Sequence, residues 1–112
     1  MDLIISGRGV VLTPAFKTLV HHKVAKVSRV LPRIVDARLM CEAEKFRRTA
    51  RLVLRDGRRT FSAEATAADL LTAVDDAVET LRRQAREAKA RRRQLKARAA
   101  RVVSLGLIEP VA

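Results

Sequence analysis

The segment with the most concentrated chemical character is residues 82–101, which carries ten Lys and Arg residues against one acid, Glu87. Eight of the ten are arginines. A guanidinium binds a phosphate through two parallel hydrogen bonds, which suits a phosphodiester surface. Like charges three and four residues apart repel one another in a helix, so we expect these cations to meet a polyanion. They are Arg82, Arg83, Arg86, Lys89, Arg91, Arg92, Arg93, Lys96, Arg98 and Arg101.

Two other roles fit this segment less well. A solvated structural face usually intersperses glutamates among its cations, and here only Glu87 does so. A basic helix on a membrane surface needs bulky apolar or aromatic residues on its other side, and this segment has only Leu95. Aromatic residues make up 3% of the chain, without Trp or Tyr, which argues against a single-strand binder that stacks bases.

A second basic cluster lies earlier, where Lys23, Lys26 and Arg29 follow at helical spacing with Lys17 and His22 nearby. On its own this cluster is typical of an ordinary solvated helix face. If both basic helices lie on the same side of one sheet, their exposed ridges form one broad positive surface. Such a surface recognises shape and phosphate spacing rather than base edges.

Groups that could support catalysis or bind a metal are not arranged for it. Asp75 and Asp76 are adjacent, as are His21 and His22, so neither pair converges on one face of a helix. Cys41 is the single cysteine, falls on the inward face of a predicted strand and is expected to be a small core residue. We therefore expect no enzyme, no metal, no cofactor and no small-molecule substrate.

The composition sets the broad class of protein. A chain of 112 residues is one small domain, and its hydrophobic content of 48% is enough for a packed core. The 24 basic and 12 acidic residues give a net charge of +12, which points to a polyanionic partner such as nucleic acid. The sequence lacks an apolar run of about 18 residues and a signal peptide, so we expect a cytoplasmic protein without a membrane partner.

Local patterns predict the elements that position the first basic cluster. Residues 3–6 form a short β-branched run that ends at Gly7, typical of a strand. Thr13 and Pro14 are typical of the N-cap and first position of a helix, and Pro32 is expected to end it. One buried helix face is predicted from seven apolar residues that recur every three or four positions: Phe16, Leu19, Val20, Val24, Val27, Val30 and Leu31.

From Ile34 the apolar period changes to two, which predicts three successive strands over residues 34–43, 49–55 and 61–66. Each strand has one apolar face, and its inward residues are often small, so a helix can lie close against them. Asp56-Gly57 is a hairpin turn signal between the last two strands.

A second helix is predicted to begin after Asp69, whose carboxylate can cap it. Its buried stripe is expected to consist of Leu70, Leu71, Val74, Ala77, Val78, Leu81, Ala85 and Ala88. Beyond Ala88 the stripe thins to Leu95, Ala99 and Val102. We expect the helix to outrun the domain there, and either to fray or to be ordered by a partner.

Together these elements predict an α+β domain in two layers, with the order β-α-β-β-β-α. The four-stranded sheet carries both helices on one face, and the pattern leaves the strand order open. We assign residues 1–95 to this binding domain. Residues 96–112 form a basic helix end and an apolar tail, for which disorder is an alternative.

Several short motifs occur in a fixed order along the chain. In the first half they are Ile5-x-Gly7-Arg8, Thr13-Pro14-Ala15 and Lys23-x-x-Lys26, and in the second half Ala63-x-Ala65, Asp69, Ala73-Val74-Asp75-x-Ala77, Leu81 and Arg83-Gln84. This ordered set resembles the ribosome hibernation-promoting factor and ribosome-associated inhibitor family of bacteria. The resemblance covers about residues 3–93 and includes the same order of elements.

The resemblance implies a protein that sits on the small ribosomal subunit, in the channel for messenger and transfer RNA. It contacts ribosomal RNA through basic residues of both helices, excludes transfer RNA and silences translation in starved or stationary cells. Long members carry a second, dimerising domain, so this chain resembles the short form and is expected to be a monomer when free. The matching positions are Lys23, Lys26, Arg82, Arg83, Arg86 and Lys89, and charge and spacing extend this set to Arg29, Arg91, Arg92 and Arg93.

Two alternatives remain open from the sequence. A general double-stranded RNA-binding module has an α-β-β-β-α order, which is contained in the order predicted here, and reads RNA by shape. Such a module would bind free RNA duplexes, whereas an occlusion factor should need the assembled subunit. A structural ribosomal protein would be present in ribosomes in every growth phase, so its stoichiometry in growing and starved cells separates it from an inhibitor.

Overall fold

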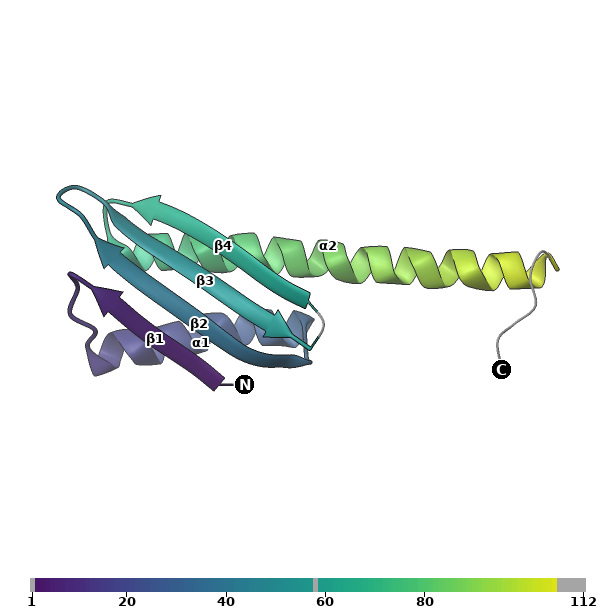
Figure 1. Cartoon of the computed structure of the whole chain (residues 1–112), viewed down its shortest axis with the longest axis horizontal. Coiled ribbons are helices and arrows are strands. Elements are labelled where there is room, and N and C mark those ends of the chain that lie inside the picture. Colours follow the sequence, from purple (N-terminus) through teal and green to yellow (C-terminus); the bar gives the residue numbers. More distant parts are fainter. Residues whose placement is uncertain (1, 58, 107–112) are drawn as a thin grey trace.

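The computed structural model describes residues 2–57 and 59–106 and has the predicted two-layer α+β architecture (Figure 1). Both helices lie on one face of a four-stranded sheet, and the other face of the sheet is open. The elements follow the predicted order: β1 (Asp2–Arg8), α1 (Pro14–Val30), β2 (Ile34–Ala43), β3 (Arg48–Asp56), β4 (Arg59–Ala67) and α2 (Leu70–Ser104).

The strands lie in the order β1-β2-β3-β4. β1 pairs with β2 in parallel, and the other two pairings are antiparallel. α1 is the crossover that a parallel pair requires. The predicted stop of the first strand at Gly7 is wrong: Gly7 pairs with Cys41 inside β1, because the parallel pairing continues to Arg8. A Cβ at Gly7 would lie 2.7 Å from Val10 Cγ2, so glycine lets the following loop fold back closely.

The core lies between the inner face of the sheet and the two helices. Alternate strand residues such as Leu39, Leu52 and Leu54 are fully buried, as the period of two predicts. They pack with the buried stripes of the helices, and alanines between them leave room for close approach. The fully buried helix residues are Val20, Val24 and Val27 of α1 and Ala73, Val74, Ala77, Leu81 and Ala85 of α2.

Two positions differ from the predicted helix faces. Leu19 is 45% exposed, because α1 buries only a narrow stripe centred on Val20, Val24 and Val27. Ala73 is fully buried although it lay outside the predicted stripe of α2. α2 packs against β3, β4 and α1 together, so its buried arc is wider than that of α1.

The helix caps form as predicted. The Thr13 hydroxyl accepts a hydrogen bond from the Phe16 backbone N–H at 3.1 Å, and Pro14 occupies the first turn. α1 ends at Val30, two residues before Pro32. At α2 the Asp69 carboxylate accepts from the backbone N–H of Leu71 at 3.0 Å and from that of Thr72 at 3.2 Å. These contacts satisfy N–H groups that have no partner within the helix.

The predicted core position of Cys41 is confirmed. Its side chain is on the inner face of β2 and the residue is only 2% exposed. Burial raises the pKa of the Cys41 thiol, which keeps it protonated and poorly nucleophilic.

α2 continues far beyond the sheet, as Figure 1 shows, and gives the described chain a length of 62 Å against 24 and 17 Å in the other directions. Its last buried side chain is Ala85, and every side chain from Lys89 to Arg101 is exposed. The boundary that we predicted at residue 95 falls inside this helix. Residues 107–112 of the predicted apolar tail lie outside the described residues.

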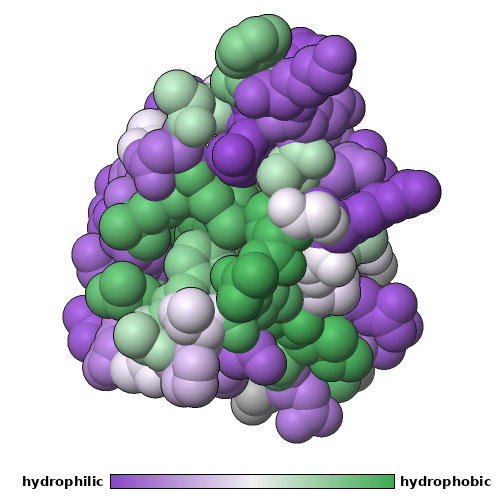
Figure 2. Space-filling model, turned by 90° about the vertical axis from the view of Figure 1, so that its left-hand side faces the viewer, coloured by the Kyte–Doolittle hydropathy of each residue, from purple (hydrophilic) through white to green (hydrophobic). Residues whose placement is uncertain are grey.

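The two ends of the body differ in character. Figure 2 looks onto the end where α1 and α2 begin, and shows apolar side chains around a hollow there. The loop before α1 exposes 88% of Val11, while Leu12, Phe16 and Leu70 are partly buried. The basic residues considered next gather toward the opposite end, where α1 ends and α2 leaves the body.

Candidate nucleic-acid interface

The open face of the sheet has many charges but no net charge. Its ion pairs join Arg51 to Glu64 at 2.7 Å and Arg55 to Asp36 at 2.5 Å, and Arg8 lies 3.9 Å from Glu42. Opposite charges on neighbouring strands neutralise one another in this way. By register this face carries four acidic and four basic residues: Asp2, Asp36, Glu42, Glu64, Arg8, Arg38, Arg51 and Arg55.

On the helix face, the part nearest the start of α2 is also paired. Lys23 Nζ of α1 donates to Asp75 Oδ1 of α2, which ties the two helices together. Arg82 Nη1 donates to Glu79 Oε1 at 2.7 Å. The side chains of Lys23 and Arg82 are only 21% and 25% exposed, and Arg82 Nε is buried without a hydrogen-bond partner among the described residues. Both cations are therefore held against the body.

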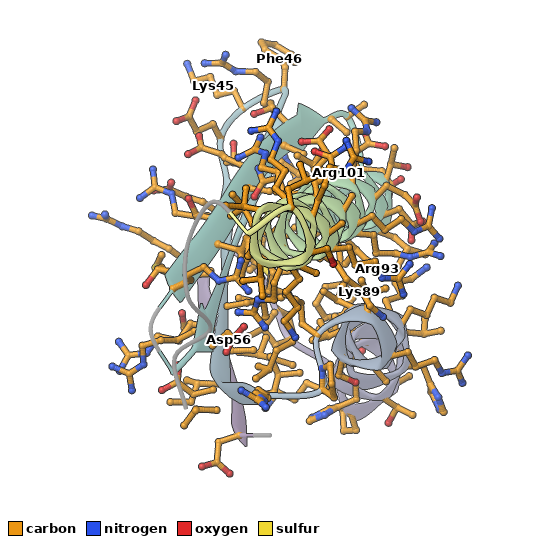
Figure 3. The ribbon with its side chains drawn as sticks, turned by 90° about the vertical axis from the view of Figure 1, so that its right-hand side faces the viewer. Lys45, Phe46, Asp56, Lys89, Arg93 and Arg101 are labelled. Carbon is orange, nitrogen blue, oxygen red and sulfur yellow. The ribbon has the colours of Figure 1, made fainter. Side chains whose placement is uncertain are left out.

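Farther along, the space between the helices opens into what we call the inter-helix hollow, lined by Arg29, Val30, Arg86, Lys89, Ala90 and Arg93. Figure 3 shows Lys89 and Arg93 on the side of α2 that faces α1. Within residues 2–57 and 59–106, no ion pair involves any of its four cations. Four unneutralised cations around one concavity give it a positive potential, which attracts polyanions.

A second concavity, the adjoining groove, lies beneath α2 where it leaves the sheet. The apolar residues Val30, Leu31 and Pro32 form part of its wall. Its one carboxylate belongs to Asp56, which is 8% exposed and accepts from Arg59 Nη2 at 3.4 Å. The remaining lining residues are all basic: Arg33, Arg59, Lys89, Arg92, Arg93 and Lys96.

Arg59 differs from the other cations of the adjoining groove. Besides its contact with Asp56, its guanidinium lies 5.3 Å from the centre of the Phe61 ring, a cation–π distance. Arg59 is therefore engaged within the fold. Lys89 and Arg93 line both concavities, so the two form one continuous basic surface.

Five of the ten predicted site residues come together on this surface: Arg29, Arg86, Lys89, Arg92 and Arg93. Lys23 and Arg82 are held in ion pairs instead. Lys26, Arg83 and Arg91 are exposed but line neither concavity.

Arg33, Arg59 and Lys96 also line the adjoining groove, although none of them is among the ten predicted site residues. Lys96 belonged to the basic run and could have been included on charge alone. Arg33 lies in the turn after α1 and Arg59 is the first residue of β4, so both stand outside the helices and reach the groove only because these segments come together beneath α2. Helical spacing carries no signal for such residues.

The chemistry available on this surface is phosphate binding. Arginine and lysine side chains dominate, and neither concavity has an aromatic lining residue on which a base could stack. The exposed Phe46 lies with Lys45 at the tip of the β2–β3 turn, far from Lys89 and Arg93 (Figure 3). In the described part of the chain, no group of three or more His, Cys, Asp or Glu side chains could hold a metal ion. Neither described helix has an apolar stretch long enough to span a membrane.

Comparison with known proteins gives one family. The family model described as Sigma 54 modulation protein / S30EA ribosomal protein matches residues 3–93. A search of curated proteins found no significant match.

Solved structures share this fold, and two of them show the extent of the likeness. A ribosomal subunit interface protein from Coxiella burnetii superposes with a TM-score of 0.75 at 22% identity, covering 80% of this chain and 99% of that chain. The N-terminal domain of Protein Y from Thermus thermophilus superposes with a TM-score of 0.73 at 24% identity, covering 78% of this chain and 98% of that chain.

Proposed function

The chain belongs to the Sigma 54 modulation protein / S30EA ribosomal protein family of ribosome-associated proteins, and from this we propose that it binds the small ribosomal subunit through the inter-helix hollow and the adjoining groove. There it occupies the channel of messenger and transfer RNA. Its action is steric, without a chemical step, and it silences cytoplasmic ribosomes in starved or stationary cells.

The observation that carries this proposal is the set of unpaired cations in the inter-helix hollow. Arg29, Arg86 and Arg93 come from two helices and surround one concavity without a carboxylate partner in the described chain. A folded protein that needed these charges only for solubility would have no reason to gather them in one place. Phosphates of ribosomal RNA can neutralise them and release counterions, which favours binding.

The shape of the surface supports contact with folded RNA rather than with single strands. Arg29 and Arg86 lie on the parts of the two helices that pack against each other and against the sheet, so their spacing is set before binding. A fixed array of cations recognises a fixed array of phosphates. The absence of an aromatic lining from both concavities accords with backbone recognition.

The test is to remove three hollow cations and compare with three removed from the sheet. R29Q/R86Q/R93Q takes charges from the hollow, and R38Q/R51Q/R55Q takes the same number from the open sheet face. Binding to purified small subunits is measured over a fourfold range of salt, at constant magnesium. For the hollow variant we expect the affinity to fall on the order of a hundredfold at about 0.1 M salt. The slope of log affinity against log salt concentration, which we call the salt slope, should become shallower by about 2. We expect the sheet variant to bind like the wild type.

A second measurement tests the steric mechanism. Saturating protein should prevent transfer RNA from binding to programmed small subunits, and R29Q/R86Q/R93Q should not prevent it. Equal binding of both variants to the subunits would overturn the assignment of the hollow. Undisturbed transfer RNA binding on subunits saturated with the protein would overturn occlusion. Equally tight binding to free RNA duplexes and to subunits would favour a general duplex-binding module.

A further inference from the structure

The part of α2 beyond the body, residues 89–104, receives little support from the rest of the fold. We call it the projecting helix. All of its side chains from Lys89 to Arg101 are exposed, and it leaves the sheet behind as Figure 1 shows. It is about 24 Å long at 1.5 Å per residue. As a continuation of the packed part of α2 it needs no new nucleus, but it has few tertiary contacts to add to its intrinsic helix stability, so a partner would hold it more firmly.

The projecting helix has seven basic residues and no acidic one: Lys89, Arg91, Arg92, Arg93, Lys96, Arg98 and Arg101. In the described chain none of them takes part in an ion pair. Their mutual repulsion further destabilises the free helix. A polyanion that neutralises them removes this repulsion as it binds.

The cations lie on two opposite flanks of the helix. Lys89, Arg93 and Lys96 are four and three residues apart, so they share the flank that faces the inter-helix hollow and the adjoining groove. Arg91 and Arg98 are seven residues apart and share another flank, and Arg101, three residues after Arg98, lies at the edge of that flank. At about 100° per residue, this second flank lies roughly opposite the first. A single row of phosphates could contact only one of the two.

Other partners fit this helix poorly. A second copy of the chain would bring two sets of like charges together. A membrane surface needs a broad apolar face, and between residues 89 and 101 Leu95 is the one bulky apolar side chain. A partner with phosphates on both sides of the helix satisfies both flanks.

Resting on the proposed function, we infer that the projecting helix inserts between two phosphate backbones of ribosomal RNA, with Arg91, Arg98 and Arg101 on the backbone remote from the hollow. The match to the family model ends at residue 93, whereas α2 continues to Ser104. Arg98 and Arg101 of the second contact thus lie beyond the residues that match the family model. It would lengthen the footprint of the protein on the subunit and slow its release.

The test uses the triple variant R91Q/R98Q/R101Q, which leaves every lining residue of the two concavities in place. Glutamine has a helix propensity close to that of arginine, so the helix is retained. On purified small subunits over a fourfold range of salt, we expect a loss of affinity on the order of a hundredfold at about 0.1 M salt and a slope reduced by about 2. R91K/R98K/R101K, which keeps the charges, should retain the wild-type slope. R38Q/R51Q/R55Q is the control for net charge.

Hydrogen exchange gives a second readout. Backbone amides of residues 94–104 should exchange fast in the free protein and become protected on the subunit. Wild-type affinity and slope in R91Q/R98Q/R101Q, or unprotected amides on the subunit, would overturn the inference. If R29Q/R86Q/R93Q still loses binding in that case, the proposed function stands and only the second backbone contact is wrong. If neither variant loses binding, the proposed function fails as well.

Discussion

The open sheet face and the inter-helix hollow both carry arginines, yet they differ in how those arginines are used. On the sheet, Arg51 and Arg55 each meet a carboxylate on a neighbouring strand. In the hollow, Arg29, Arg86 and Arg93 have no such partner within the described residues. Composition alone therefore does not identify a binding surface in a chain with a net charge of +12. The distribution of the carboxylates distinguishes the two surfaces, because it decides which cations are neutralised within the fold.

The same difference divides α2 along its length. Its first turns contain Asp75 and Glu79, which pair with Lys23 and Arg82. The projecting helix has no acid at all. The cations of the paired part are neutralised, and in our proposal the cations of the unpaired part contact the RNA. Surface ion pairs contribute little to stability, typically between zero and about 1 kcal/mol, so their main effect here is on the electrostatic field.

The largest effect on stability should come from a substitution in the core that supports both the open sheet face and the helix face. Leu52 of β3 is fully buried beneath the sheet and contributes to the core that both faces share. Leu52→Ala should lower the free energy of unfolding by about 2–5 kcal/mol, because it leaves a cavity. Urea unfolding measures this, with Arg38→Gln on the open face as the control. A loss below about 1 kcal/mol would show that the two layers repack freely and do not depend on one core.

A smaller effect on stability should follow when arginines of the sheet face lose their carboxylate partners, so that they are unpaired like the arginines of the hollow. D36N/E64Q removes the partners of Arg55 and Arg51 and raises the net charge by two. Because both pairs are exposed, we expect a stability loss below about 1 kcal/mol. Binding to free RNA duplexes should strengthen, with a salt slope larger by about 0.7–0.9 per new phosphate contact.

The same variant should bind small subunits within about twofold of the wild type, because the sheet is not the contact face in our proposal. Filter binding to a free duplex and titration of subunits distinguish the two effects, and R51Q/R55Q serves as the converse control. Much tighter binding of D36N/E64Q to subunits would mean that the sheet also faces the RNA.

The sequence predicted the elements and layers of this fold because their signals are local. The period of two over β2 and the Thr13-Pro14 cap depend only on neighbouring residues. The placement of Gly7 inside β1 was missed, because parallel pairing with a distant strand overrides the local signal.

For the site, charge density predicted which helices carry the cations. It did not predict which of these cations are held in ion pairs and which line the concavities. Lys23 pairs with Asp75 across 52 positions, and Arg33 and Arg59 reach the adjoining groove from a turn and from the start of β4. These contacts depend on how elements meet in space, and helical spacing does not encode them. The exposed course of α2 from Lys89 to Arg101 agrees with the prediction that the helix outruns the domain, since the thinning of the apolar stripe is itself a local pattern.

The smallest effect concerns the end of α2 that anchors the paired region, where Asp69 caps the helix. The Thr72 hydroxyl and the Leu71 backbone N–H donate to this carboxylate and hold the pKa of Asp69 below its usual value. Because the folded-state pKa is lower than that of the unfolded chain, the ionised carboxylate stabilises the fold above the unfolded-state value of about 3.9. This contribution is lost as the pH falls through the folded-state pKa.

Asp69→Ala should therefore lower the Tm by a few degrees at about pH 7, and the difference from the wild type should shrink on acidification below about pH 4. Asp69→Asn keeps the capping oxygen without the charge, so it should lie closer to the wild type and show little of this pH dependence. Thermal unfolding of the three proteins across this pH range measures both effects. A deficit of Asp69→Ala that is the same at every pH would mean that the ionised cap contributes nothing. The start of α2 would then depend on the neutral hydrogen bonds of the cap and on packing, and not on the charge of Asp69.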